Sequence, residues 1–239
     1  MKKKILFLGA SGRVGPFVTP GLEDEYDLYL TDIQRHPHGT PIATVDITSY
    51  DQVYEATRGM DAIMNFTVVR NDPALSFHVN TLDAWHVMKA AAAHGIKKVI
   101  HSGPQTISQA YEHDFDIIDV PSAPGSGYYG CTKFLSREIC RIFAQTYAIE
   151  TIYFVFAGLG PSLTEPVSGQ EVPLFRIFWE DLQHACRLAL EIESIPGHFQ
   201  EFNIFSCESH GKYRLDKARD ILGFQPTQPW ESYYKRRPL

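Results

Sequence analysis

The chain has 239 residues, of which 44% are hydrophobic and 21% are charged, a usage that excludes disordered, collagen-like and coiled-coil chains. Its formal net charge of -6 is spread without long blocks of one sign, so the sequence offers no basic surface for a nucleic acid or an anionic membrane. No stretch approaches the roughly 20 apolar residues of a membrane span. We therefore expect one folded domain over residues 1–239.

The four cysteines show neither a C-x-x-C pair nor a partner histidine pair, which argues against a zinc site and against a redox dithiol. This usage favours a reduced compartment, and we expect a cytoplasmic protein without a metal centre. The lysine-rich start imitates a secretory signal. The apolar run at residues 5–8 is too short for one and meets glycines, so we interpret it as a strand.

Short apolar runs alternate with longer segments of helical period along the chain. The runs predict buried strands, and the segments predict helices. Such alternation requires a parallel sheet with helices on both faces, which predicts a doubly wound α/β fold of the Rossmann type. The predicted strands are residues 5–8, 28–30, 43–45, 62–65, 99–101, 152–156 and 201–205, and the longer predicted helices are residues 73–94, 129–147, 179–192 and 215–222.

After Phe156 the regular pattern weakens. Glycines and prolines interrupt the next segment, which predicts a loop or lid rather than another regular unit. We expect the substrate-binding elements mainly in residues 157–239, a small C-terminal part whose last helix is capped by Gly223.

A glycine-rich turn follows the first predicted strand. Its spacing is G-x-x-G-x-x-G, with glycines where a chain must turn tightly and approach a pyrophosphate closely. The turn opens a predicted helix, whose first amide groups and positive end suit phosphates. We expect a dinucleotide here, although an ordinary strand-to-helix turn can carry the same glycines. The predicted contacts are Gly9, Ser11, Gly12, Arg13, Val14 and Gly15.

Asp32 ends the second predicted strand, twenty residues after Gly12. A carboxylate at this place accepts hydrogen bonds from the adenosine ribose and repels a 2′-phosphate, so we expect NAD rather than NADP. Arg13 and Arg35 lie close enough in sequence to keep NADP as the alternative.

Three further residues are predicted to contact the cofactor. Asp46 and Ile47 end the third strand, where we expect them at the adenine ring. Asp46 is equally suited to cap a helix. Asn65 ends the fourth strand and is the remaining predicted contact.

Tyr129 and Lys133 are four residues apart, which places both on one face of a predicted helix. A nearby ammonium favours the phenolate and lowers the pKa of a tyrosine from about 10 toward the range where it exchanges a proton with a substrate. We expect Tyr129 to be the acid-base and Lys133 to lower its pKa. A half-buried tyrosine beside a solvated lysine is the alternative.

The glycine turn and the Y-x-x-x-K motif together resemble the extended short-chain dehydrogenase/reductase family, also called NAD-dependent epimerases/dehydratases. In that family the lysine also binds the nicotinamide ribose, the tyrosine takes or gives the proton, and hydride moves between the substrate carbon and the nicotinamide ring. The resemblance implies these roles for Tyr129 and Lys133, and a homodimer paired through helices 73–94 and 129–147. It spans nearly the whole chain and includes Asn80, Gly160-Pro161, Glu180-Asp181-Leu182 and Phe202-Asn203-Ile204.

The family's third catalytic residue, a serine or threonine after the fifth strand, corresponds to Gly103 in this chain. Ser102 and Thr106 are the neighbouring hydroxyls, and the resemblance implies one of them as the donor to the reacting oxygen. Losing such a donor can cost ~10² to 10³ in rate. A sensor or scaffold that binds the cofactor without catalysis is therefore an alternative.

Within that family the compact C-terminal part is most similar to uronate dehydrogenases, which oxidise a hexuronate at its anomeric carbon to an aldarolactone with NAD. The resemblance implies a small sugar or sugar acid as substrate. A nucleotide-sugar epimerase or dehydratase that retains its cofactor is the alternative. A sugar carboxylate suits a guanidinium, and Arg70 and Arg176 are the candidates, although either can be a surface arginine.

Overall fold

The computed structural model describes residues 2–104, 123–168, 171–172, 175–208, 211–227 and 230–234. A seven-stranded sheet forms its centre, with the strand order β3-β2-β1-β4-β5-β6-β7. Each neighbouring pair of strands is parallel. The strand order reverses between β1 and β4, and such a switch point is where doubly wound sheets bind ligands. The predicted fold class is confirmed.

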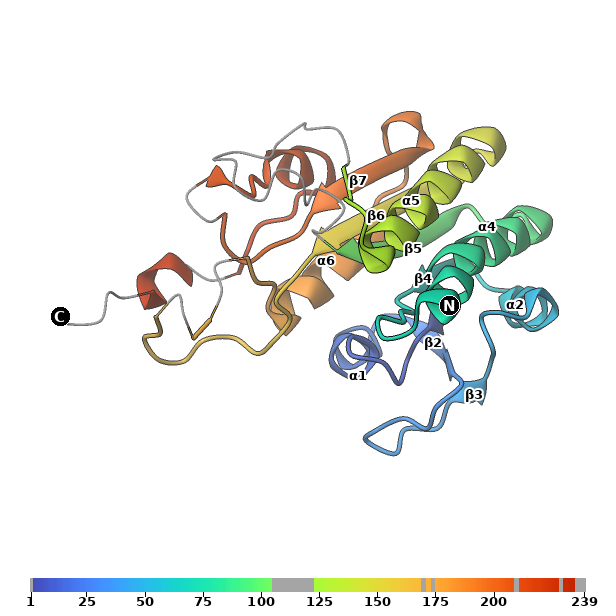
Figure 1. Cartoon of the computed structure of the whole chain (residues 1–239), viewed down its shortest axis with the longest axis horizontal. Coiled ribbons are helices and arrows are strands. Elements are labelled where there is room, and N and C mark those ends of the chain that lie inside the picture. The colour runs from blue at the N-terminus through green and yellow to red at the C-terminus, as the bar shows by residue number, and fades with distance from the viewer. Residues whose placement is uncertain are drawn as a thin grey trace.

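The elements follow the predicted alternation (Figure 1). The strands are β1 (Lys4–Leu8), β2 (Asp27–Asp32), β3 (Ala43–Thr44), β4 (Ala62–Asn65), β5 (Lys98–Pro104), β6 (Glu150–Phe156) and β7 (Phe199–Asn203). The α-helices are α1 (Gly15–Val18), α2 (Tyr50–Thr57), α3 (Pro73–Ser76), α4 (Asp83–His94), α5 (Tyr128–Tyr147) and α6 (Trp179–Glu191). Shorter helical segments are η1 (Thr19–Gly21), η2 (Phe77–Leu82), η4 (Pro196–His198), η6 (Ala218–Leu222) and η7 (Trp230–Tyr233).

Two apolar cores lie on the two faces of the sheet, because successive side chains of a strand point to opposite faces. Phe154 of β6 belongs to the core beneath α1 and α6. Its neighbour Tyr153 belongs to the core beneath α2, α4 and α5. Every residue of β4 and of β6 is buried, as expected for parallel strands covered on both faces.

The predicted helix 73–94 is one continuous helical stretch made of α3, η2 and α4, and η2 is π-helical. Asn80 of η2 is fully buried. Its Nδ2 donates to the backbone carbonyl of Val69 at 2.7 Å, and its Oδ1 accepts from the backbone N–H of Val69 at 2.8 Å. Nδ2 also donates to Thr132 Oγ1 at 3.2 Å. This residue therefore ties the loop after β4 to α5.

Helix α1, which follows the glycine turn as predicted, is short. It is α-helical only over Gly15–Val18 and continues as the 3-10 segment η1. Pro20 and Gly21 follow, and both residue types disfavour a helix interior. A helix this short has a small macrodipole, and the predicted phosphate contact at its start stays a prediction.

Cys131, Cys140 and Cys186 are free thiols, and Cys140, Cys186 and Cys207 are buried. Within the part of the chain that the structure describes, no helix has the length and apolar character to cross a membrane.

Candidate active site

A cleft of about 590 Å³ opens at the carboxyl ends of the central strands. It brings together six of the predicted site residues, which come from the first turn, the loop after β4, the end of β5 and the start of α5. These are Arg13, Val14, Arg70, Ser102, Tyr129 and Lys133. The other lining residues include Phe17, Phe156, Ala157, Gly158, Leu159 and Trp179.

The glycine turn at one end of the cleft has a backbone that other residues would disrupt. Gly9 has φ +87°, and a Cβ there would lie 3.0 Å from the backbone of Phe66. A Cβ on Gly15 would collide with the backbone of Ala10, at 2.6 Å from its Cα. Gly9 and Gly15 are thus required by close packing within the turn and against the loop after β4, while Arg13 and Val14 of the same turn line the cleft. A tight glycine turn after β1 with a cation beside the cleft suits a dinucleotide diphosphate, and the site fits NAD. Contacts of Gly9, Ser11, Gly12 and Gly15 with the cofactor stay predictions.

Asp32 lies beside this turn, as predicted. Its Oδ2 accepts from the backbone N–H of Ser11 at 3.0 Å, and its Oδ1 accepts from that of Gln34 at 3.0 Å. The Ser11 hydroxyl donates to the Gln34 carbonyl at 2.8 Å. A carboxylate has about four lone-pair sites, so Asp32 can hold the loop after β2 and still accept from ribose hydroxyls.

The residues predicted at the adenine ring have protein partners. Asp46 Oδ1 accepts from the amide of Thr48 at 2.9 Å and from its hydroxyl at 2.7 Å. The cap of α2 is Ser49 instead, whose side chain accepts from Gln52. The Ile47 side chain is buried in the core. Contacts of Asp46 and Ile47 with the cofactor stay predictions.

Asn65 is fully buried beneath the loop after β4. Its Oδ1 accepts from the amide of Thr67 at 3.1 Å and lies 2.7 Å from the Thr67 hydroxyl, whose single proton it shares with Asp83 Oδ2, also at 2.7 Å. Its Nδ2 donates to Asp83 Oδ2 at 3.0 Å. The side chain therefore supports the cleft floor from below, and its predicted cofactor contact stays a prediction.

Tyr129 lies at the N-terminal end of α5 and lines the cleft. The guanidinium of Arg70 lies 4.9 Å from the centre of its ring. Burial raises the pKa of the Tyr129 phenol above its ordinary value, while Arg70, by charge and hydrogen bond, and Arg13 oppose that rise. The cations that act on the phenol are therefore arginines from two loops.

Lys133 lines the same cleft. The side chain is buried, and Nζ donates to the backbone carbonyl of Thr67 at 3.0 Å. Burial lowers the pKa of Lys133, and the nearby Asp83 carboxylate opposes this. The ammonium faces Thr67, and the groups that oppose the effect of burial on the pKa of Tyr129 are Arg70 and Arg13. The predicted effect of Lys133 on Tyr129 stays a prediction.

Ser102 lines the cleft, whereas Thr106 lies outside the described residues. Gly103 borders the ring of Tyr153, which fills its side-chain space. A Cβ at position 103 would lie 2.6 Å and 2.8 Å from two ring carbons of Tyr153. The Tyr153 hydroxyl donates to the Lys133 carbonyl at 2.9 Å. Tyr153 thus explains the glycine at this position, and Ser102 is the hydroxyl left at the end of β5 to face the cleft.

Arg176 is not among the residues that line the cleft. Its guanidinium lies against the backbone of Gly160, where a Cβ would overlap it, and 5.6 Å from the ring centre of Phe178. The structure therefore brings Arg70, and not Arg176, to the candidate site.

Two features of the site escaped the sequence patterns. Phe17 of α1 and Trp179 of α6 stack with ring centres 4.4 Å apart and form part of the cleft wall. Asp83 lies inside a long predicted helix, where a single acidic residue is expected to face the solvent. In the structure its side chain is fully buried. Glu180-Asp181 and the aromatic residue before them mark the helix start, but nothing in the sequence indicates that Trp179 meets Phe17.

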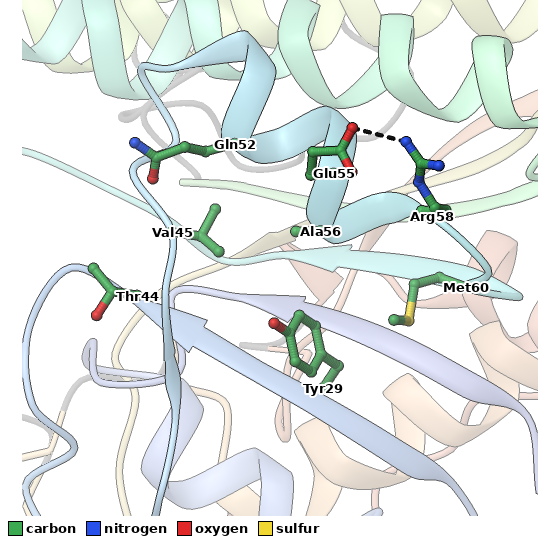
Figure 2. Close-up of a pocket in the computed structure, with 8 residues that line it drawn as sticks. All are labelled: Tyr29, Thr44, Val45, Gln52, Glu55, Ala56, Arg58 and Met60. Carbon is green, nitrogen blue, oxygen red and sulfur yellow. Dashed lines mark hydrogen bonds and ion pairs between the residues drawn. The ribbon is translucent and has the colours of Figure 1, made fainter.

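A second hollow of about 470 Å³ lies between β2, β3 and α2. Figure 2 shows Tyr29 and Met60 on its walls and the ion pair between Glu55 and Arg58 at its rim. It contains neither the tyrosine-lysine pair nor the glycine turn. The cleft above β1 and β4 is therefore the candidate active site.

Residues 5–170 match the NAD dependent epimerase/dehydratase family. The match covers more than half of the chain, and the protein belongs to this family. This membership confirms the resemblance to an NAD-dependent family that was inferred from the two motifs.

Curated relatives include uronate dehydrogenases. The chain is 28% identical to that of Pseudomonas putida over 68% of its own length and 62% of the relative's length. It is 26% identical to that of Pseudomonas syringae pv. tomato, over 82% of this chain and 72% of the relative. An NAD-dependent glucose-6-phosphate dehydrogenase of Haloferax volcanii is 22% identical over 95% and 94% of the two chains. The match to the first enzyme thus spans less than two thirds of that enzyme.

Solved structures have the same fold. A mutated uronate dehydrogenase matches with a TM-score of 0.82 and 20% identity, covering 100% of this chain and 89% of that one. A mutant of uronate dehydrogenase from Agrobacterium tumefaciens complexed with NAD also gives 0.82, at 17% identity and with 100% and 92% coverage. A UDP-galactose 4-epimerase gives 0.75 at 18% identity, with 95% and 94% coverage.

Proposed function

We propose that this protein is an NAD-dependent oxidoreductase that oxidises a small sugar acid of the uronate type at its anomeric carbon. The observation that carries this proposal is the meeting of Tyr129, Lys133, Ser102 and Arg70 in one cleft beside the glycine turn. The similarity to uronate dehydrogenases supports the substrate class.

In the proposed reaction Tyr129 acts as the phenolate, which Arg70 and Arg13 favour against the effect of burial, and its oxygen takes the proton of the anomeric hydroxyl. The C1–H bond breaks at the same carbon, and the C1–O bond becomes the carbonyl of a lactone. Bound NAD supplies the hydride acceptor. Ser102 donates a hydrogen bond to the reacting oxygen, and donors of this kind are worth ~10² to 10³ in rate. Lys133 lies one helical turn from Tyr129 and lines the cleft, where it would hold the nicotinamide ribose when NAD is bound.

The charges of the cleft suit an anionic substrate. Arg13, Arg70 and Lys133 line it, and no carboxylate is among its lining residues within the described part of the chain. Such a surplus of positive charge attracts both a diphosphate and a sugar carboxylate. Arg70 is the side chain that we assign to the sugar carboxylate, because it is exposed and a guanidinium binds carboxylates with two parallel hydrogen bonds.

The test follows NADH absorbance with glucuronate, galacturonate, glucose and glucose 6-phosphate. We expect turnover of at least one uronate, and Tyr129→Phe lowers it by about 10² to 10⁴ while NAD binding is retained. Tyr147→Phe, at the exposed far end of the same helix, is the matched control. Absence of any turnover that depends on Tyr129 contradicts the proposal.

One observation favours a second candidate, a protein that binds NAD without catalysis. Tyr153 fills the space in which the family's serine side chain would stand at position 103. This candidate predicts tight NAD binding without turnover in the same assay. An epimerase or dehydratase predicts instead that the cofactor copurifies with the protein and that no net NADH appears.

We further propose a homodimer, which pairs α4 and α5 with their copies. These helices lie side by side (Figure 1) and expose Trp85, Leu135 and Ile142, next to the exposed Leu82 at the end of η2. Light scattering should give twice the chain mass, and Ile142→Glu should give the monomer mass. A monomeric wild-type protein at micromolar concentration contradicts this pairing. The cytoplasm stays the predicted location.

A further inference from the structure

A buried carboxylate lies beneath the cleft. Asp83 begins α4 and is fully buried. Its Oδ2 accepts from the Thr67 hydroxyl at 2.7 Å and from Asn65 Nδ2 at 3.0 Å. Its Oδ1 is buried and has no hydrogen-bond partner among the described residues. A carboxylate in such surroundings is costly unless an opposite charge lies near it.

Lys133 provides that opposite charge. Its ammonium donates to the backbone carbonyl of Thr67 at 3.0 Å. Thr67 therefore contacts the Asp83 carboxylate with its hydroxyl and the Lys133 ammonium with its carbonyl. The two charges stabilise each other. Burial raises the pKa of Asp83 and Lys133 opposes the rise, while burial lowers the pKa of Lys133 and Asp83 opposes the fall.

The other titratable groups around Lys133 do not supply a negative charge. Arg70, in the loop after β4, is a cation that lowers the pKa of Lys133. His101 of β5 is neutral at ordinary pH, because burial lowers its pKa to about 3. Cys140, on α5 itself, is a buried thiol whose pKa burial raises. Among these groups the carboxylate of Asp83 is therefore the counter-charge.

We propose that Asp83 is the buried counter-ion of Lys133 and that, through Thr67, it positions the Lys133 ammonium for its part in the reaction. The role in catalysis rests on the function proposed above, whereas the pairing itself does not. Asp83 is a positioning residue, since it lies beneath the cleft and is not among the residues that line it. Without its charge, a lysine in this core holds its proton less firmly.

The test is Asp83→Asn, which keeps the size of the side chain and removes its charge. Lysines labelled with ¹³C at Cε report the protonation of Lys133 by NMR, and Lys133→Met assigns the resonance. We expect the Lys133 ammonium to lose its proton at lower pH in Asp83→Asn than in the wild type. With NAD and a uronate, the alkaline limb of kcat/KM should move to lower pH, with a loss of about tenfold or more on that limb.

Asp181→Asn is the matched control. Asp181 is equally buried and accepts from the amide of Thr227 at 2.8 Å, but it belongs to another network. This variant should lose stability and leave the Lys133 resonance and its titration unchanged. An Asp83→Asn protein in which Lys133 titrates as in the wild type overturns the proposal.

Should Asp83→Asn fail to fold, the reciprocal variant gives the answer. In Lys133→Met the Asp83 carboxyl resonance should titrate at higher pH than in the wild type, because the favourable charge is gone. An unchanged Asp83 titration also overturns the proposal. If the NMR shifts occur but no uronate is oxidised, the pairing stands and the proposed function fails.

Discussion

The guanidinium of Arg70 lies 4.9 Å from the centre of the Tyr129 ring, and this is the contact that opposes the effect of burial on the phenol. The backbone of Arg70 is held in place as well, because the Tyr128 hydroxyl donates to its carbonyl at 2.6 Å. The loop after β4 thus brings a cation to the acid-base residue of α5. In this structure Arg70 opposes the rise in the pKa of Tyr129, which is part of the role that the motif spacing had assigned to Lys133.

Removal of the Arg70 charge should have two effects that can be separated. Arg70→Gln raises the pKa of Tyr129 further, so the acidic limb of kcat/KM moves to higher pH. It should also raise KM for a uronate by about 10- to 100-fold, the size of a charge-assisted hydrogen bond, and change KM for a neutral aldose much less. Arg58→Gln, which breaks an exposed pair with Glu55, should leave both quantities unchanged. Equal effects on the uronate and the aldose would contradict the assignment.

Gly103→Ser should destabilise the protein instead of restoring the family pattern. The new side chain meets the ring of buried Tyr153, and overpacking of this kind costs about 1–3 kcal/mol. The free energy of unfolding in urea measures the loss.

The loss at position 103 should shrink in a Tyr153→Leu background, because the colliding ring atoms are then absent. Gly127→Ser is the matched control, since no atom lies within 4 Å of its Cβ position and it is the N-cap residue of α5, where serine is favoured. Additive costs of Gly103→Ser and Tyr153→Leu would refute the steric explanation.

Asp32 should set the preference for NAD. Its carboxylate stands beside the glycine turn, fixed by the amides of Ser11 and Gln34, where a 2′-phosphate would be repelled. Calorimetry should show NAD bound about 10- to 100-fold more tightly than NADP, and Asp32→Asn should narrow this ratio. Asp24→Asn, at an exposed position, should leave the ratio as it is. Equal affinities of the wild type for the two cofactors are incompatible with this reading.

The stability of the fold should depend on His101 in acid. Burial lowers the pKa of His101 to about 3 from 6.5. Between these values the unfolded chain binds a proton that the folded chain does not. The free energy of unfolding therefore decreases as pH falls below 6.5, by up to about 1.4 kcal/mol per pH unit from this residue.

Urea denaturation between pH 7 and pH 4.5 measures this effect. The difference in stability between the wild type and either His101→Phe or His101→Gln should narrow on acidification, because neither variant has the titrating group. The two variants will differ in absolute stability but should share the same slope. If the free energy of unfolding of the variants falls with pH as steeply as that of the wild type, His101 binds a proton as readily in the folded chain as in the unfolded chain, and the prediction is wrong.

The fold could be predicted because its signals are local. Each strand is a short apolar run, and the glycines of the first turn keep their meaning without any knowledge of the rest of the chain. The boundaries were less accurate, with β7 starting and ending two residues earlier than expected. The short α1 was also readable in principle, since Pro20 and Gly21 stand where the helix would have continued.

The electrostatics of the site could not be predicted in the same way. The motif placed Tyr129 and Lys133 on one helix, but the direction of the Lys133 ammonium depends on Thr67 and Asp83, which come from two other segments. The burial of an acid such as Asp83 can be predicted only when the residues that donate hydrogen bonds to it are known. For Arg176 the position in the sequence predicted a contact with the substrate carboxylate. In the structure its guanidinium lies against Gly160 and not in the cleft.

The π-helical segment η2 has a consequence for how the chain can vary. A π-turn holds more residues than an α-turn, so the six residues of η2 fix the angular phase of α4. Deleting one of them would let the helix become regular, because a π-turn absorbs about one extra residue, and the residues after it would keep their direction. The same deletion within the α-helical part of α4 would instead turn every later residue by about 100° about the axis. Residues 77–82 are therefore the place where this long helix can lose a residue and still direct Asp83 toward Thr67.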